Sequence, residues 1–136
     1  MINAHNKAIY AKLNGTVGVT SLLSSATAIY FHQAPVGATM PYIVYIHAGG
    51  GDVPMSQTDT GDVSYYIKAV ATTALVAGNI AAAIRTALHE QEATMTMDAP
   101  WYLYRVQAQE YISFPENVEK TQFWHMGNKY RFRSSQ

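Results

Sequence analysis

The sequence predicts an α+β fold, a mainly antiparallel β-sheet with an N-terminal helix and one long Ala-rich helix packed on one face of the sheet. The first observation is the order of patterns along the 136 residues: helix, strands, helix, strands. The second is the alternation over residues 63–71, which is typical of a half-buried strand. The third is residues 73–90, where apolar side chains recur three and four positions apart, as on one stripe of a helix. This length makes a single domain, residues 1–136, which can bury a core without disulfides.

The N-terminal part of the chain contains one clear helix and one short strand. Residues 3–14 predict the helix, and Asn14-Gly15 supplies its stop. Residues 16–28 are ambiguous between a second short helix and irregular structure, because a glycine and several serines weaken the helical pattern. Residues 28–32 predict a short strand, which ends before a proline and a glycine.

Two strands in the middle of the chain are expected to pair through a long loop. Residues 42–46 are all β-branched or aromatic, and Pro41 precedes them. The segment 48–61 contains four glycines, one proline and two aspartates, with Asp62 at its far edge. This segment exceeds the usual hairpin loop, so we expect a long loop that orders on assembly and joins an antiparallel pair with residues 63–71.

The C-terminal third predicts further strands. Residues 101–112 form the first of them. One face is expected to carry Tyr102, Tyr104, Val106 and Ala108, and the other Leu103, Arg105, Gln107 and Gln109. Residues 121–126 and 129–133 flank Gly127-Asn128, which indicates either a tight hairpin or a bend in one long strand.

The composition narrows the functional classes. Nine Lys and Arg balance nine Asp and Glu, which argues against a dedicated nucleic-acid binder. Charged residues make up 13% of the chain and hydrophobic ones 49%, which favours either oligomerisation or an uncharged polar surface. Cysteine is absent, and no apolar run approaches the roughly 20 residues of a membrane helix. The N-terminus lacks the pattern of a secretory signal. We therefore expect a cytoplasmic protein without a membrane partner.

No catalytic constellation stands out in the sequence. The triple glycine at 49–51 lacks the Lys-Ser/Thr of a phosphate-binding loop, and the five histidines lack metal-ligand spacing. The loop carboxylates Asp52, Asp59 and Asp62 do not have calcium-loop spacing. Turn-forming, solvated aspartates explain them best. We therefore expect no enzyme activity, cofactor or metal.

Aromatic side chains are the most informative feature of the surface. Ten tyrosines are present, and Tyr42 with Tyr45, like Tyr65 with Tyr66, must lie on opposite faces of a strand. One member of each pair therefore lies away from the core, as is typical of protein interfaces. Near the C-terminus, cationic side chains alternate with aromatic ones, as in a solvated face or an intersubunit row of salt bridges. The candidate interface residues are Tyr45, Tyr66, Lys129, Arg131 and Arg133.

The order of these segments resembles the tail-completion, or tail-terminator, family of siphophages. The resemblance rests on Ala28-Ile29-Tyr30, the Pro35 and Gly37 spacer and the strand Pro41 to Tyr45. It continues through the Gly/Asp loop, the Ala-rich helix, Tyr102 to Val106 and Lys129 to Arg133. It covers nearly the whole chain.

The resemblance implies a subunit of a homohexameric ring in the virion, at the head-proximal end of the tail. Such a ring sits on the tail tube protein, ends tail polymerisation and presents a surface to head connector proteins. DNA is only passing cargo in its lumen, and assembly takes place in the host cytoplasm. Under this reading Asp52, Asp59 and Asp62 would line the passage or contact the tube and repel DNA phosphate. The alternatives are a head-side connector or adaptor ring, with twelve copies expected by analogy, and a small-molecule enzyme or binding domain.

Overall fold

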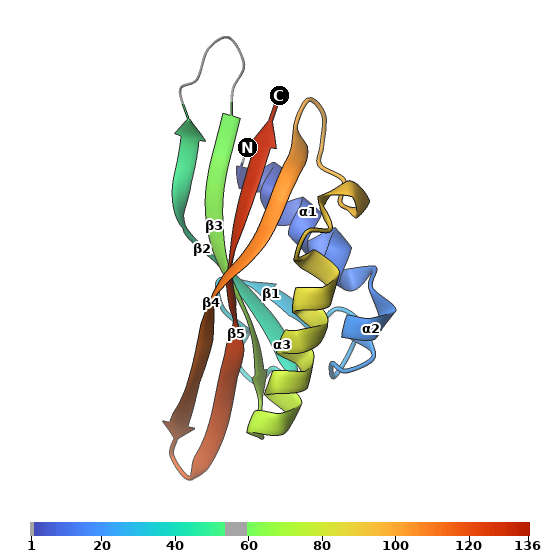
Figure 1. Ribbon diagram of the computed structural model, residues 1–136. Helices are drawn as coiled ribbons and strands as arrows, with labels where there is room; N and C mark the ends of the chain where they lie inside the picture. Colours follow the sequence, from blue (N-terminus) through green and yellow to red (C-terminus); the bar gives the residue numbers. More distant parts are fainter. Residues whose placement is uncertain (1, 54–59) are drawn as a thin grey trace.

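A computed structural model describes residues 2–53 and 60–136 of the chain. The helices and strands follow one another as α1 (Ile2–Asn14), α2 (Val17–Thr20), β1 (Ile29–Phe31), β2 (Tyr42–Val53), β3 (Thr60–Ala71), α3 (Ala74–Leu88), the 3-10 helix η1 (Glu92–Thr94), β4 (Tyr102–Val118) and β5 (Thr121–Ser135). The strands form one sheet in the order β1-β2-β3-β5-β4 (Figure 1). Only β1 and β2 pair in parallel, and the other neighbours are antiparallel.

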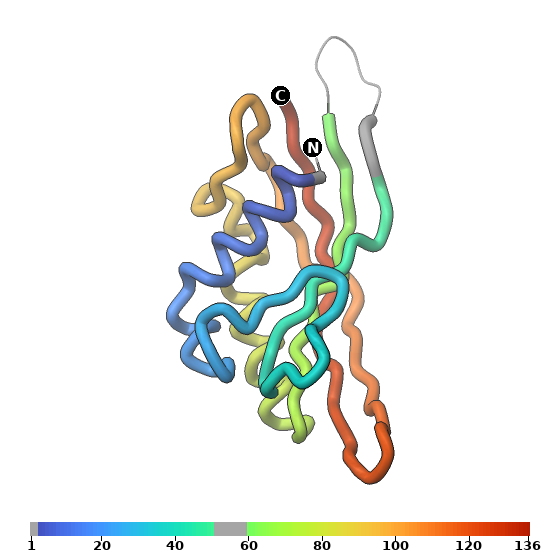
Figure 2. Tube along the Cα trace, turned by 180° about the vertical axis from the view of Figure 1, so that it is seen from behind, coloured from blue at the N-terminus to red at the C-terminus, as the bar shows by residue number. Residues whose placement is uncertain are grey.

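The described helices all lie on one side of the sheet. Figures 1 and 2 show α1, α2 and α3 on the same side, while the strands form the opposite side of the molecule. The predicted α+β fold, with a mainly antiparallel sheet covered on one face, is thereby confirmed. We call the other side of the sheet the helix-free face. None of the described helices is long and apolar enough to cross a bilayer.

The core lies between the helices and the covered face of the sheet. The alternation of β3 places Tyr65 and Ile67 under the helices, and the apolar stripe of α3 packs Ile80 and Ile84 against them. Thr73 caps the start of helix α3, because its hydroxyl accepts a hydrogen bond from the Val76 amide at 3.3 Å.

Helix α1 is joined to the sheet by a polar contact within this core. The buried Tyr65 hydroxyl donates a 2.6 Å hydrogen bond to Asn6 Oδ1. Burial is the main cause that raises the pKa of Tyr65, so the phenol stays protonated. The bond therefore joins α1 to β3 without placing a charge in the core.

The expected loop over residues 48–61 was wrong. Strand β2 continues to Val53 and β3 already begins at Thr60, so the connection 54–59 lies outside the described residues. The glycines bend the strand instead of ending it. Gly49 has φ 146° and Gly50 φ 95°, and the register shifts between His47 and Gly49 as in a β-bulge. A Cβ on Gly50 would clash with the backbone of β3.

The sequence left open whether Gly127-Asn128 forms a hairpin or a bend in one strand. The structure shows one long strand, β5, through these residues. The chain reverses earlier, between Val118 and Thr121, where Glu119 has φ 55°. Gly127 is needed not for a turn but for the close approach of β5 to β3. The backbone of β3 passes so close that a Cβ at this position would clash with it.

The predicted faces of β4 were partly wrong. The register of β4 against β5 shifts between Leu103 and Arg105 and again between Ala108 and Tyr111. Each bulge moves the following side chains to the other face. Leu103 is therefore buried in the core with Val106. Tyr102 and Tyr104, expected on the same face as Val106, are exposed.

Replacing Gly127 tests the close approach of β3 and β5. Gly127→Ala is expected to lower the free energy of unfolding by about 1–3 kcal/mol, because a Cβ would overlap the backbone of Ile67 and Lys68. Urea denaturation followed by circular dichroism measures the change. Gly18→Ala is the matched control, since nothing lies within 4 Å of its added Cβ. Equal losses in both variants would contradict the argument.

Candidate assembly surface

Tyrosines from neighbouring strands divide between the two sides of the sheet. Tyr65 and Tyr45 face the helices, and Tyr45 is only 6% exposed. Tyr66 and Tyr42 point to the helix-free face, where Tyr42 contacts Tyr30 edge-on at 5.7 Å between ring centroids. The expectation that each pair splits is thereby met. Within the first pair, Tyr42 and not Tyr45 is available to a partner, because Ile43 and Tyr45 fill the core.

An apolar hollow lies on the helix-free face across three strands. It has a volume of about 220 Å³ and is lined by Ile46, Tyr66, Lys68, Ile112 and Phe114. The Lys68 ammonium lies 5.2 Å from the centroid of the Phe114 ring, within the range of a cation–π contact. Burial is the main cause that lowers the pKa of Lys68. A surface with this lining favours contact with another protein.

A histidine extends the hollow along β5. The His125 ring stacks on Phe114 with centroids 4.6 Å apart and an interplanar angle of 10°. Its Nε2 lies 2.6 Å from the Glu116 carboxylate. Burial lowers the pKa of His125 and outweighs the opposing effect of Glu116. The imidazole is therefore neutral at pH 7 and donates Nε2–H to Glu116.

A row of charged side chains lies further along the helix-free face. Arg131 binds the Asp62 carboxylate with both arms of its guanidinium, with Nε–Oδ1 at 2.8 Å and Nη2–Oδ2 at 2.5 Å. The Arg133 Nε lies 4.0 Å from the same carboxylate. The hydrogen bond from Arg131 is the main cause that lowers the pKa of Asp62. One carboxylate therefore serves two guanidinium groups.

Positive charge is concentrated on this face although the chain as a whole is neutral. Among the residues with a register partner, two carboxylates, Asp62 and Glu116, lie on the helix-free face, and the exposed Glu110 lies in the bulge of β4. The cationic side chains on the same face are Lys68, Arg105, Lys129, Arg131 and Arg133. The excess of cations makes this face complementary to an acidic surface.

The structure separates the three candidate aspartates. Asp62 lies in β3, not in a loop, and is held by Arg131. Asp52 lies in β2 opposite Gly61, and its side chain is not among those described. Asp59 lies outside the described residues. Strand register pairs Lys129 with Tyr66, which lines the apolar hollow. Four of the five candidate interface residues therefore lie near Asp62 or the hollow, namely Tyr66, Lys129, Arg131 and Arg133.

Several residues of this surface were not predicted from the sequence. Ile46 could have been predicted, because the alternation of β2 places it on the same face of the sheet as Tyr42. Ile112 and Phe114 could not, because the bulge between Ala108 and Tyr111 reverses the alternation that precedes them.

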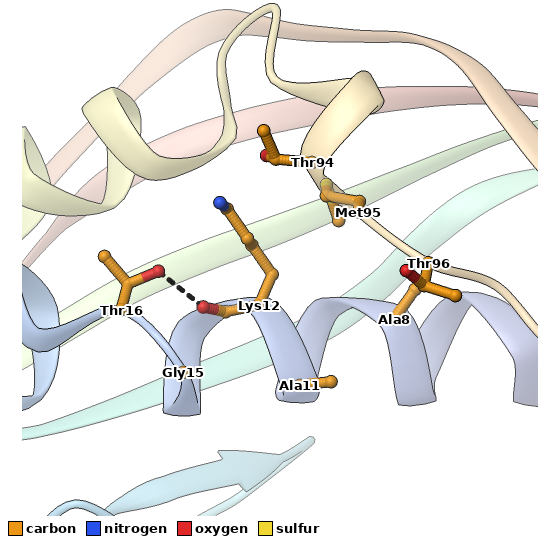
Figure 3. A pocket seen from close by; sticks show the side chains of 8 residues that line it. All are labelled: Ala8, Ala11, Lys12, Gly15, Thr16, Thr94, Met95 and Thr96. Carbon is orange, nitrogen blue, oxygen red and sulfur yellow. Dashed lines mark hydrogen bonds between the residues drawn. The ribbon is translucent and has the colours of Figure 1, made fainter.

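A second hollow, on the helical side, shows no catalytic arrangement. It has a volume of about 280 Å³ between the end of α1 and η1, and Figure 3 shows its lining, including Lys12, Thr16 and Met95. The Thr16 hydroxyl donates to the Lys12 carbonyl at 2.6 Å. Over residues 2–53 and 60–136, no group of three or more His, Cys, Asp or Glu is placed to hold a metal ion.

Comparisons with known proteins agree with this architecture. The family model described as tail completion protein gp17 matches residues 7–111, well over half of the chain. A chain in the structure titled "Virion of native gene transfer agent (GTA) particle" is similar, with a TM-score of 0.80 and 18% sequence identity. The match covers 99% of this chain and 97% of the other, and at this identity it shows a shared fold. A search of curated proteins found no match.

The fold and the family match together define a structural protein of the virion tail. The chain belongs to the family of the tail completion protein gp17.

The Asp62–Arg131 pair predicts how the stability depends on pH. The folded state lowers the pKa of Asp62, so this stabilisation is present above the unfolded pKa of about 4 and is lost as the pH falls through the folded value. Arg131→Gln is expected to raise the pKa of Asp62 toward about 4 and to reduce this acid-dependent loss. Carbon-13 NMR titration of the carboxyl group and urea unfolding below pH 4 measure both effects. Lys129→Gln is the control, since the Asp62 pKa depends on Arg131 and Arg133. An unchanged Asp62 pKa in Arg131→Gln would contradict the assignment.

Proposed function

We propose that the protein forms a ring, a hexamer by the family resemblance, that caps the tail tube and ends its polymerisation. The ring then presents the surface to which head connector proteins attach. The observation that carries this proposal is the helix-free face, where an apolar hollow lies beside a row of unbalanced positive charge. The family to which the chain belongs supports the same reading.

The apolar hollow supports a subunit contact. A monomer would leave Ile112 and Phe114 open to water on a sheet face that no described helix covers. A neighbour on this face removes that surface from water and gains roughly 25 cal/mol for each Å² of apolar area buried. Tyr66 lies between the hollow and the charged row and is our first candidate for the centre of the contact.

The charged row supports the same contact in a different way. Arg131 and Arg133 share the single carboxylate of Asp62, and Lys129 adds a further positive charge nearby. Acidic side chains on a neighbour would balance this row and fix the orientation of the contact. We therefore move Asp62 from the lumen to the subunit contact. Asp52 and Asp59 remain our candidates for contact with the tube or the lumen.

The remaining partners follow from this position. The ring would lie at the head-proximal end of the tail, between the tail tube protein and the head connector proteins, after assembly in the host cytoplasm. DNA would pass through the lumen as cargo. The role is structural and needs no enzyme activity.

Ring formation can be measured directly. Native mass spectrometry with negative-stain imaging of the purified protein is expected to show a ring of six copies. Tyr66→Ser is expected to weaken assembly at least tenfold, because the ring loses the aromatic side chain between the hollow and the charged row. Val17→Ser is the control, since Val17 is 76% exposed on α2, on the helical side of the sheet and away from the helix-free face.

Two outcomes would contradict the proposal. A ring of twelve copies would favour a head-side adaptor instead. A strict monomer at high protein concentration, both alone and with purified tail tubes, would argue against a capping ring altogether.

A further inference from the structure

A groove lies on the opposite side of the sheet from the apolar hollow, between α3 and the β4–β5 hairpin. It has a volume of about 490 Å³, and we call it the α3–β4 groove. Its lining includes Gly78, Ala81, Ala82, Arg85, Tyr111 and Asn128. The groove runs beside the middle of α3, where residues 78–85 form one wall and β4 and β5 the other. The strands are also much longer than the helix that covers them. Fifteen residues span about 22 Å in α3 and about 50 Å in β5.

The helical wall of this groove is built for close approach. Gly78, Ala81, Ala82 and Arg85 recur three and four positions apart, so they form one face of α3. The first three have little or no side chain, which lets a backbone segment reach the helix. Leu75, one turn before Gly78, is 74% exposed and supplies an apolar rim.

The groove also contains hydrogen-bond donors that lack acceptors. Asn128 is only 2% exposed, and its Nδ2 finds no partner among the described residues. The buried Nε of Arg85 is likewise without a partner in the described part of the chain. Buried donors of this kind are normally satisfied in a finished structure. A ligand for this groove must therefore supply acceptors and a negative charge.

The tip of the β4–β5 hairpin has the matching chemistry. Figures 1 and 2 show that this hairpin projects beyond the helical layer. Val118 at its tip is 47% exposed, and Glu119 is an exposed carboxylate with no ion pair among the described residues. The other carboxylate of the hairpin end, Glu116, already accepts from His125. The tip thus offers one apolar side chain and one free carboxylate.

We propose that the α3–β4 groove binds the β4–β5 hairpin tip of a second copy of this chain. Glu119 of the incoming copy meets Arg85 and Asn128, and Val118 packs on the small residues of α3. This inference rests on the proposed ring and adds a second contact between its subunits to the one proposed for the helix-free face. Groove and tip are different surfaces of one chain, so the contact is head-to-tail and repeats from copy to copy, as a ring requires.

Disulfide crosslinking tests the contact, because the chain contains no cysteine of its own. A variant with both Ala82→Cys and Val118→Cys is expected to give a crosslinked ladder on mild oxidation. A mixture of the two single variants is expected to give only a one-to-one crosslinked dimer. The matched control pairs Val118→Cys with Val17→Cys, which is exposed on α2, and is expected to give no ladder.

Charge exchange tests the same contact independently. Glu119→Arg and Arg85→Glu are each expected to weaken association roughly 30-fold or more, and the double variant is expected to restore it. Lys120→Gln, next to Glu119, is the control and should assemble like the wild type. Native mass measures assembly, and circular dichroism checks that each variant is folded.

The outcomes separate this inference from the proposed ring. If the wild type forms rings but the double-cysteine variant gives no ladder, the groove contact is overturned and the ring stands. If the wild type stays monomeric and the double-cysteine variant gives no ladder either, both are overturned. A ladder together with charge rescue supports the groove contact.

Discussion

Helices α1 and α3 can bury only one face of the five-stranded sheet, and the rest of the structure depends on that constraint. The tyrosines divide accordingly, with Tyr65 sealed under the helices and Tyr66 left on the other side. The sheet is mainly antiparallel, and a sheet of this kind can tolerate water on one face. The face then needs either polar side chains or a partner. This chain places a charged row at one end of it and an apolar hollow at the other, so only part of the face suits water.

Strand length explains why the β4–β5 hairpin projects from the rest of the molecule. Helix α3 spans less than half the length of β5, so the far end of the hairpin stands beyond the helical layer. Asn128 lies opposite the middle of α3, with its backbone in the sheet and its side chain in the lining of the α3–β4 groove. One chain thus carries both a groove and a protrusion, which are two surfaces that can meet in a head-to-tail assembly.

Much of the fold was predictable because its helices and its central strand follow simple periods. The alternation of β3 and the stripe of α3 place their residues correctly. The errors occur where backbone geometry breaks the period. Glycines at 49 and 50 were interpreted as a loop but form a bulge, and two bulges in β4 exchange its faces. A bulge depends on which strand lies alongside, and this information is not local to the sequence. The choice between Tyr42 and Tyr45 failed for a similar reason, since alternation separates them but does not say which side the helices cover.

The neutral net charge of the chain conceals a strongly uneven distribution. The equal numbers of cationic and anionic residues argued against nucleic-acid binding. The structure nevertheless places five of the nine Lys and Arg on the helix-free face. In the proposed ring this excess is balanced by a neighbour, so the charges cancel within the assembly and not within the subunit. The two parts of the face would then contribute differently. Exposed charges are screened over about 8–10 Å in physiological salt and mainly set orientation and specificity, whereas the apolar hollow does not depend on salt in this way. Affinity for the neighbour would therefore come mostly from the hollow around Tyr66, and the Asp62–Arg131 row would decide which way round the neighbour binds.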